Sequence, residues 1–185
     1  EWFVYSDGSR QHISDIEEQL TIANSSWGDD ILVGRLDSPN TLDGRQGDDR
    51  MEGGHLGDTY AFGAAYDLDT IVESSTPAAG AIDRVVFSAS VVPNTVQLER
   101  DGGSLIVDLG NGLDRLTITD GLTTRQVEVF SFADGTQWRL EEVRSRLLQG
   151  NDTDDELIGF DDRDDCLDGL GGSDRLEGGL GDDQY

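Results

Sequence analysis

Residues 44–61 read G-R-Q-G-D-D-R-M-E-G-G-H-L-G-D-T-Y-A, which is two nine-residue units in succession. Each unit opens with glycine and carries aspartate at its sixth place and a large apolar residue at its eighth. The same spelling returns at residues 169–185, which read G-L-G-G-S-D-R-L-E-G-G-L-G-D-D-Q-Y. Self-similarity at so short a period is typical of a solenoid, in which each repeat adds part of a coil. The period therefore predicts a parallel β-helix built from turns and very short strands.

The register of these units extends through two blocks of the chain. At each sixth place stands aspartate or asparagine, and two residues later a large apolar side chain is expected to point inward. So regular a coincidence is not an accident of composition. The sixth places are Asp30, Asn40, Asp49, Asp58, Asp69, Asp155, Asp165, Asp174 and Asp183. The inward set is Leu32, Leu42, Met51, Tyr60, Ile71, Leu157, Leu167, Leu176 and Tyr185.

The residue types at the turns suit a hard cation. Glycines at the first, second and fourth places permit a tight turn with positive φ, which aims backbone carbonyls inward. The aspartate adds a carboxylate, and Ca²⁺ takes six to eight such oxygens at about 2.3 to 2.6 Å. No soft ligand is needed. We therefore expect the chain to bind several calcium ions.

These repeats resemble the repeats-in-toxin family, the calcium-dependent β-rolls of secreted bacterial toxins, proteases, lipases and adhesins. In that family two nonapeptides make one coil, so calcium lies between turns about 18 residues apart. The resemblance implies five stacked pairs: Asp30 with Asp49, Asn40 with Asp58, Asp49 with Asp69, Asp155 with Asp174, and Asp165 with Asp183. It also implies carbonyl ligands from turns that contain Gly28, Gly44, Gly47, Gly53, Gly169, Gly171 and Gly178.

Some turns depart from the family pattern. Residues 34–43 and 159–168 hold ten residues each and lack the glycine at the fourth place. Asn40 replaces an aspartate, and Leu56 replaces a glycine. We expect the sites that use these turns to be weak or empty.

Composition restricts the partners and the ion-free state. With 39 acidic residues against 13 basic ones, the formal net charge is −26. This field repels nucleic acid and anionic membrane surfaces. Two carboxylates about 4 Å apart repel by about 4 kcal/mol at an effective dielectric of 20, so we expect the calcium-free chain to be disordered. The alternative interpretation is a merely solvated or disordered acidic region.

The chain divides into four segments of an all-β fold. Residues 1–24 are expected to be the tail of an upstream linker module, with a helix capped by Ser14 and Glu17. Residues 25–72 and 150–185 form the two β-roll blocks. Residues 80–148 form a β-hairpin linker that ends in a capping helix after Trp138. The aromatics Phe130, Phe132 and Trp138 are either a ligand platform or core packing.

The sequence lacks the signatures of the enzyme classes considered. His12 and His55 are too far apart in sequence for an H-E-x-x-H zinc site, and no G-x-S-x-G elbow occurs. No apolar run suits a membrane helix, so direct membrane insertion is not expected. We expect a non-catalytic fragment of a large extracellular or cell-surface protein, with adjacent repeat blocks as neighbours. Family resemblance implies export by type I secretion machinery and folding on calcium binding outside. The alternatives are a spacer in a surface adhesin and an accessory domain of a secreted toxin, protease or lipase.

Overall fold

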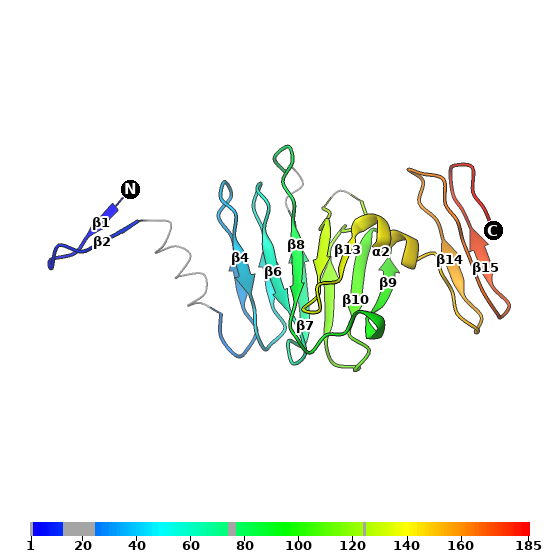
Figure 1. Ribbon diagram of the computed structural model, residues 1–185, viewed down its shortest axis with the longest axis horizontal. Helices are drawn as coiled ribbons and strands as arrows, with labels where there is room; N and C mark the ends of the chain where they lie inside the picture. The colour runs from blue at the N-terminus through cyan, green and yellow to red at the C-terminus, as the bar shows by residue number, and fades with distance from the viewer. Residues whose placement is uncertain (1, 13–24, 74–76, 124) are drawn as a thin grey trace. The chain divides into compact units, whose positions relative to one another are not determined.

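The computed structural model describes residues 2–12, 25–73, 77–123 and 125–185, which fall into two compact units. Unit 1 is Glu1–Gln137 and unit 2 is Trp138–Tyr185. Nearly all regular structure is β-strand (Figure 1), so the predicted all-β class is confirmed. The boundary between the units lies inside β13 (Gln137–Arg139), ahead of the segment boundary that the sequence suggested near residue 149. Among the described residues, no helix is long and apolar enough to cross a membrane.

The roll of unit 1 is a coil in which the chain alternates between two parallel sheets. One sheet contains β3, β5 and β7, and the other contains β4, β6 and β8, which lie side by side in Figure 1. The strands are as short as the nonapeptide period requires. Their bounds are β3 Ile31–Val33, β4 Thr41–Asp43, β5 Arg50–Glu52, β6 Thr59–Phe62, β7 Leu68–Val72 and β8 Arg84–Phe87.

The apolar residues at the eighth places form the core of the roll. Leu32 pairs with Met51 and Met51 with Ile71, while Leu42 pairs with Tyr60 in the facing sheet. Burying each such side chain contributes about 1.5 to 3 kcal/mol. The inward set is therefore confirmed for its buried members, Leu32, Leu42, Met51, Tyr60, Ile71, Leu157 and Leu167. Leu176 is half-buried and Tyr185 is exposed, because no later described strand packs over the last coil.

The linker continues both sheets of the roll instead of standing beside it as a separate set of hairpins. β11 (Arg115–Ile118) pairs in parallel with β7, and β12 (Val129–Ser131) pairs in parallel with β8. β9 (Gln97–Asp101) and β10 (Ser104–Asp108), after the 3-10 turn Pro93–Thr95, extend the first sheet as antiparallel strands. Open strand edges carry unpaired backbone groups, and pairing them with β11 and β12 satisfies these groups.

The linker aromatics form a core. Phe87 stacks on Phe132 with ring centroids 4.6 Å apart and on Phe130 at 6.5 Å. Phe130, Phe132 and Trp138 are all buried. Phe130 and Phe132 therefore belong to the core of unit 1, and Trp138 is a buried residue of unit 2, so these aromatics are packing residues.

Unit 2 begins with a helix and continues as a second roll. Helix α2 (Leu140–Arg146) follows Trp138 as predicted, with acids in its first turn and arginines in its last, as the helix dipole favours. Val143 and Leu148 bury its apolar face. β14 (Glu156–Ile158) and β15 (Arg175–Glu177) then pair in parallel, and Leu157 stands opposite Leu176.

The N-terminal hairpin repeats the end of the linker. β1 (Trp2–Val4) and β2 (Arg10–His12) pair antiparallel. Their bounds match those of β12 and β13 at an offset of 127 residues, and the turns share the sequence of aspartate followed by glycine. The helix predicted around Ser14 and Glu17 lies outside the described residues.

Candidate calcium-binding turns

An acidic residue stands at or next to the start of each roll strand and ties its turn to the preceding one. The N–H of Asp30 donates to Oδ1 of Asp49 at 2.8 Å, and the N–H of Asp49 donates to Oδ1 of Asp69 at 3.0 Å. In the other sheet, the N–H of Asn40 donates to Oδ1 of Asp58 at 2.7 Å. We call Asp30, Asp49 and Asp69 the first acid column, and Asn40, Asp58 and Asp83 the second.

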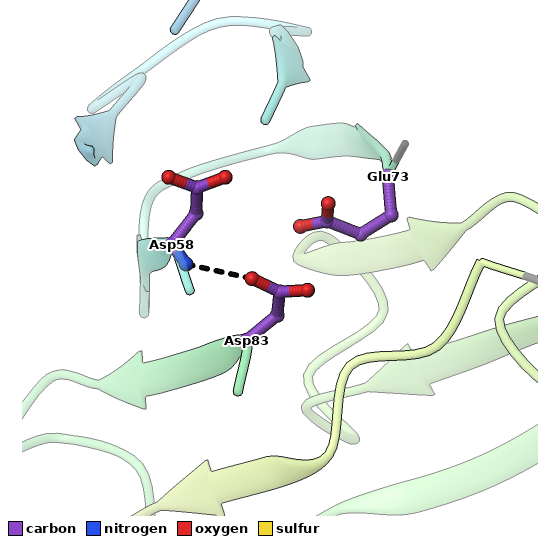
Figure 2. Close-up of side chains that lie close together, drawn as sticks. All are labelled: Asp58, Glu73 and Asp83. Carbon is purple, nitrogen blue, oxygen red and sulfur yellow. Dashed lines mark hydrogen bonds between the residues drawn. The ribbon is translucent and has the colours of Figure 1, made fainter. Parts of the chain in front are cut away.

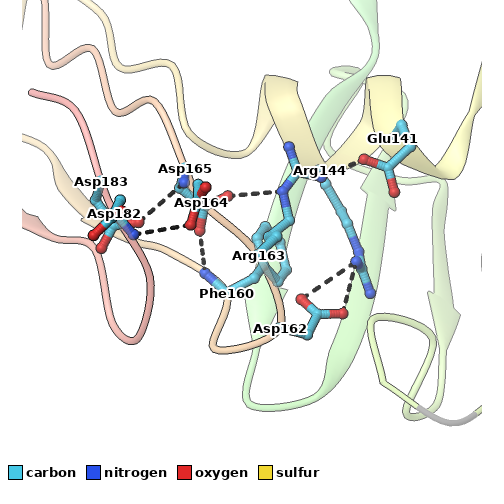
Figure 3. Close-up of polar contacts among 9 residues, drawn as sticks. All are labelled: Glu141, Arg144, Phe160, Asp162, Arg163, Asp164, Asp165, Asp182 and Asp183. Atoms are coloured by element: carbon cyan, nitrogen blue, oxygen red, sulfur yellow. Dashed lines mark hydrogen bonds and ion pairs between the residues drawn. The ribbon is translucent and has the colours of Figure 1, made fainter.

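Unit 2 has the same arrangement. The N–H of Asp155 donates to Oδ1 of Asp174, and that of Asp165 donates to Oδ1 of Asp183, both at 3.0 Å. Figure 3 shows the second pair. All five pairs expected from the sequence are thus neighbours in the structure. Their role as calcium ligands stays a prediction.

Two acids of these columns were missed in the sequence. The N–H of Asp58 donates to Oδ1 of Asp83 at 2.6 Å, and the N–H of Asp83 donates to Oε2 of Glu128 at 2.7 Å. Both acids precede an apolar residue by two places, Val85 and Phe130, which is the repeat's own signature. That signal was available, but the first, second and fourth places before these acids carry no glycine.

Aspartates at the fifth place of the repeat form a second ladder. In it, the carboxylate of the earlier turn accepts from a backbone N–H of the later turn. Oδ1 of Asp29 accepts from the N–H of Asp48, and Oδ1 of Asp48 accepts from the N–H of Leu68. In unit 2, Asp154 and Asp164 accept from the later turn in the same way. Adjacent turns are thus joined by two carboxylates, which packs negative charge densely along the column.

Four turns share a backbone with positive φ at their second and fourth residues, and we call them open turns. They are residues 44–49, 64–69, 169–174 and 178–183, and the residues with positive φ are Arg45, Gly47, Ala65, Asp67, Leu170, Gly172, Gly179 and Gly181. In the left-handed region a residue other than glycine costs about 1 to 2 kcal/mol. The open form is therefore imposed by the surroundings at Arg45, Ala65, Asp67 and Leu170.

Five other turns, which we call closed, satisfy the acid internally. In each, the side-chain oxygen of the last residue accepts from the backbone N–H of the second, as Asp58 does from Gly54 at 2.6 Å. None of these turns, all within the described residues, carries a positive φ. The closed turns are residues 25–30, 34–40, 53–58, 150–155 and 159–165.

The open turns of unit 1 leave buried carboxylate oxygens without a partner. Asp49 is 2% exposed and Asp69 is 1% exposed, and Oδ2 of each has no hydrogen-bond partner. Burial raises the pKa of Asp69 to about 8, and it also raises the pKa of Asp49. A charged carboxylate in such a place needs a cation or donors. The residues of turns 44–49 and 64–69 thus fit a calcium ion.

Glycine is required where the turn wraps its acid. A Cβ at Gly44 would lie 2.2 Å from Oδ2 of Asp49. Gly53, Gly169 and Gly178 are equally close to the acid of their own turns, while Gly47 packs against the backbone of Gly28. Gly171 lies near Asp152, and a Cβ at Gly28 would meet open space. Gly44, Gly53, Gly169 and Gly178 thus lie against the carboxylate of their own turn, whereas Gly28, Gly47 and Gly171 do not.

A cluster of three buried acids lies where the second acid column meets the end of β7. Asp58, Glu73 and Asp83 are all buried and offer ligand oxygens within 4.8 Å of one another (Figure 2). Among the described residues it is the cluster whose geometry suits a metal ion. Burial, together with the charges of Glu128 and Asp58, raises the pKa of Asp83 to about 6. Glu73 stands beside Gly53, because the preceding Val72 pairs with Glu52.

In unit 2 an arginine contacts Asp165, the earlier acid of the pair Asp165 and Asp183. Nε of Arg163 lies 2.9 Å from Oδ1 of Asp165 and forms an ion contact, not a directed hydrogen bond. Arg163 also pairs with Glu141 of α2, and Arg144 pairs with Asp162 at 3.1 Å while lying over the ring of Phe160 (Figure 3). Arg144 of the helix and Arg163 of the roll thus join α2 to the first coil of unit 2. Asp165 there faces a protein cation, whereas Oδ2 of Asp49 and Oδ2 of Asp69 have no hydrogen-bond partner among the described residues.

Comparisons with known proteins point in the same direction as the geometry. No curated protein matches the chain. Residues 105–142 match the family model described as the haemolysin-type calcium binding protein related domain. The match runs from β10 through β11, β12 and β13 to the start of α2. This short match supports calcium binding, and with it the relation of the chain to the calcium-binding repeats-in-toxin family.

Proposed function

We propose that this chain is a non-catalytic, calcium-binding β-roll of a secreted protein and that it folds when calcium binds. The observation that carries the proposal is the pair of unpartnered, buried Oδ2 atoms on Asp49 and Asp69 in adjacent open turns. Calcium accepts several carboxylate and carbonyl oxygens in a flexible geometry. A cation between these turns would neutralise both carboxylates.

The second acid column supports further ions. The cluster of Asp58, Glu73 and Asp83 holds three buried carboxylates, and each pair at such a separation repels by roughly 3 kcal/mol at an effective dielectric of 20. Unit 2 adds the open turns that end in Asp174 and Asp183. We therefore propose several ions for the chain. The closed turns that end in Asp30, Asn40, Asp155 and Asp165 are proposed as weaker or empty positions.

Folding and calcium binding are linked in this proposal. An ion that binds only the folded state stabilises it by RT ln(1 + [L]/Kd) for each independent site. A net charge of −26 opposes the folded stack when no ion is present. Export unfolded through type I secretion machinery from a calcium-poor cytoplasm, followed by folding outside, uses this linkage. The extracellular location is part of the proposal.

The test is a calorimetric calcium titration followed in parallel by circular dichroism. We expect a cooperative rise of β-sheet signal that ends at the same calcium concentration as the binding heat. Binding heat without a change of spectrum would refute folding on binding. No binding heat at millimolar calcium would refute the function itself.

A further inference from the structure

Asp114 of the linker holds the backbone of the last open turn of unit 1. It is 2% exposed, and its Oδ1 accepts from the N–H groups of Tyr66 and Asp67, each at 2.9 Å. Oδ2 accepts from the N–H of Ala65 at 3.0 Å and from the side-chain amide of Asn111 at 2.5 Å. One carboxylate thus binds three successive backbone donors, which is the arrangement of an anion-binding nest.

The sheet register brings Asp114 to this turn. Arg115 pairs with Leu68, and the N–H of Arg115 donates to the carbonyl of Asp67 at 2.9 Å. Asp114 therefore stands beside Asp67, at the start of a strand that lies in the matched linker domain. Asn111 fixes the carboxylate by also accepting from the N–H of Asp114 at 2.9 Å. The linker supplies the contact without belonging to the repeats.

Turn 64–69 needs this support, because its sequence is A-A-Y-D-L-D and contains no glycine. Ala65 has φ of 65° and Asp67 has φ of 60°, a region that disfavours side chains. In the other open turns of the chain, the fourth residue is glycine. The same turn carries Asp69, whose Oδ2 is buried and has no hydrogen-bond partner. An energetically unfavourable backbone is thus held in the form that presents a free carboxylate oxygen.

We propose that Asp114 is a positioning residue that presets turn 64–69 for calcium before the ion arrives. This inference rests on the proposed function. Asp114 directs its oxygens to N–H groups and does not ligate the ion. Outer-shell partners of this kind fix the orientation of metal ligands, and their loss typically weakens metal affinity tenfold to a hundredfold. The linker domain is therefore part of the calcium site and not only a spacer between rolls.

Terbium luminescence on the full chain tests the proposal. Tb³⁺ is a hard, oxygen-seeking cation that emits when a nearby tyrosine absorbs. Tyr66 belongs to the turn itself, and burial followed by the influence of Asp43 raises its pKa to about 12. The emission lost in Tyr66→Phe reports the site at turn 64–69. The emission lost in Tyr185→Phe reports unit 2, where the Tyr185 hydroxyl accepts from Gly178.

Asp114→Asn should weaken Tb³⁺ binding in the Tyr66 component about tenfold to a hundredfold. The Tyr185 component and the circular dichroism at saturating calcium should stay as in the unmodified chain. The control is Asp134→Asn, which changes an acid that accepts from Thr136 in an exposed linker turn. This control should shift neither component.

The outcomes separate the inference from the function on which it rests. Equal Tyr66-reported affinity in Asp114→Asn and the unmodified chain would overturn the role of Asp114 while leaving calcium binding intact. Equal weakening of both components would show a general loss of structure and would also overturn it. If Asp114→Asn does not fold, Asn111→Ala decides, because it loosens the carboxylate and should weaken only the Tyr66 component. Absence of Tb³⁺ and calcium binding in the unmodified chain would refute the proposed function.

Discussion

Asp69 and Asp114 are buried aspartates on neighbouring strands, yet their carboxylates are satisfied in opposite ways. Asp114 accepts three backbone N–H groups and one amide, and these bonds outweigh its burial and lower its pKa. Asp69 accepts the N–H of Asp49 with one oxygen, while the other has no partner, and burial raises its pKa to about 8.

The difference teaches where the roll depends on an ion. A buried carboxylate is stable when donors surround it and costly when they do not. At the linker end of the first acid column, backbone and amide donors satisfy the carboxylate of Asp114. Within the column, Oδ2 of Asp49 and Oδ2 of Asp69 have no hydrogen-bond partner. We therefore expect calcium beside Asp49 and Asp69, whose Oδ2 atoms have no hydrogen-bond partner, and no ion on Asp114 itself.

The largest expected effect comes from removing a carboxylate inside the first column. Asp49→Ala should lose at least one bound ion in a calcium titration, because Asp49 is bonded to the turns on both sides. Asp30→Ala should lose less, since Asp30 belongs to a closed turn and bonds to Ser26. Equal stoichiometry in the two variants would contradict the pairing of the turns.

Removing the charge of Asp69 and removing the charge of Asp114 should have opposite effects on the residual β-sheet signal in chelator at pH 8. Asp69→Asn removes a charge whose burial costs on the order of 3 to 5 kcal/mol, so residual β-sheet signal should rise. Asp114→Asn removes a charge that donors stabilise, so the signal should fall. Circular dichroism in chelator measures both. A fall in Asp69→Asn would show that its charge is already compensated without calcium.

Proton release during a calcium titration distinguishes a folded ion-free chain from a disordered one. The pKa of Asp69 in the ion-free fold is about 8, well above the value of about 4 in an unfolded chain. Protonated Asp69 thus adds stability to the ion-free fold that is complete below about pH 4 and lost as the pH rises through about 8. Calcium that binds the ion-free fold must displace this proton, whereas Asp69 of a disordered chain has already lost it at pH 7.

Calorimetry in buffers of different ionisation enthalpy at pH 7 would count the released protons. Because we expect the ion-free chain to be disordered, close to no proton should be released as calcium folds it. Release of close to one proton, lost in Asp69→Asn, would show that the ion-free chain is already folded with Asp69 protonated and would contradict folding on calcium binding.

The smallest effect is expected from relieving backbone strain in an open turn of unit 2. Leu170 is 65% exposed and has φ of 58°, so Leu170→Gly should stabilise the calcium-loaded chain by about 0.5 to 1 kcal/mol. Leu180 is 68% exposed but has no positive φ, so Leu180→Gly should give no gain. Thermal denaturation at saturating calcium compares them. A lower midpoint in Leu170→Gly than in Leu180→Gly would show that the open backbone is not strained there.

The columns and the core were predictable from sequence because they depend on a local pattern. An acid followed at two places by an apolar residue set the register of the repeats. The resemblance to the repeats-in-toxin family, with two units per coil, then implied the pairs of Asp49 with Asp69 and of Asp155 with Asp174. The same pattern continues at Asp83, where the lack of glycines concealed it.

The open or closed state of a turn was not predictable, because neighbouring turns decide it. Residues 53–58 contain three glycines and form a closed turn, in which Asp58 bonds to Gly54. Leu56 occupies the fourth place there, where an open turn needs positive φ. Residues 64–69 contain no glycine and form an open turn, because Asp114 comes from a strand 45 or more residues later to bind their N–H groups. No local pattern reports such a contact.

The central claim, that specific calcium coordination folds the chain, is tested most directly by circular dichroism with matched cations. Screening by salt depends on ionic strength, with a Debye length of about 8 Å at 0.15 M, and sodium delivers it as well as any cation. Magnesium demands a smaller, near-octahedral shell and keeps its waters. Calcium near the millimolar range should therefore produce the β-sheet spectrum, while magnesium at equal concentration and sodium at equal ionic strength should not. The same spectrum with magnesium or sodium would contradict the account.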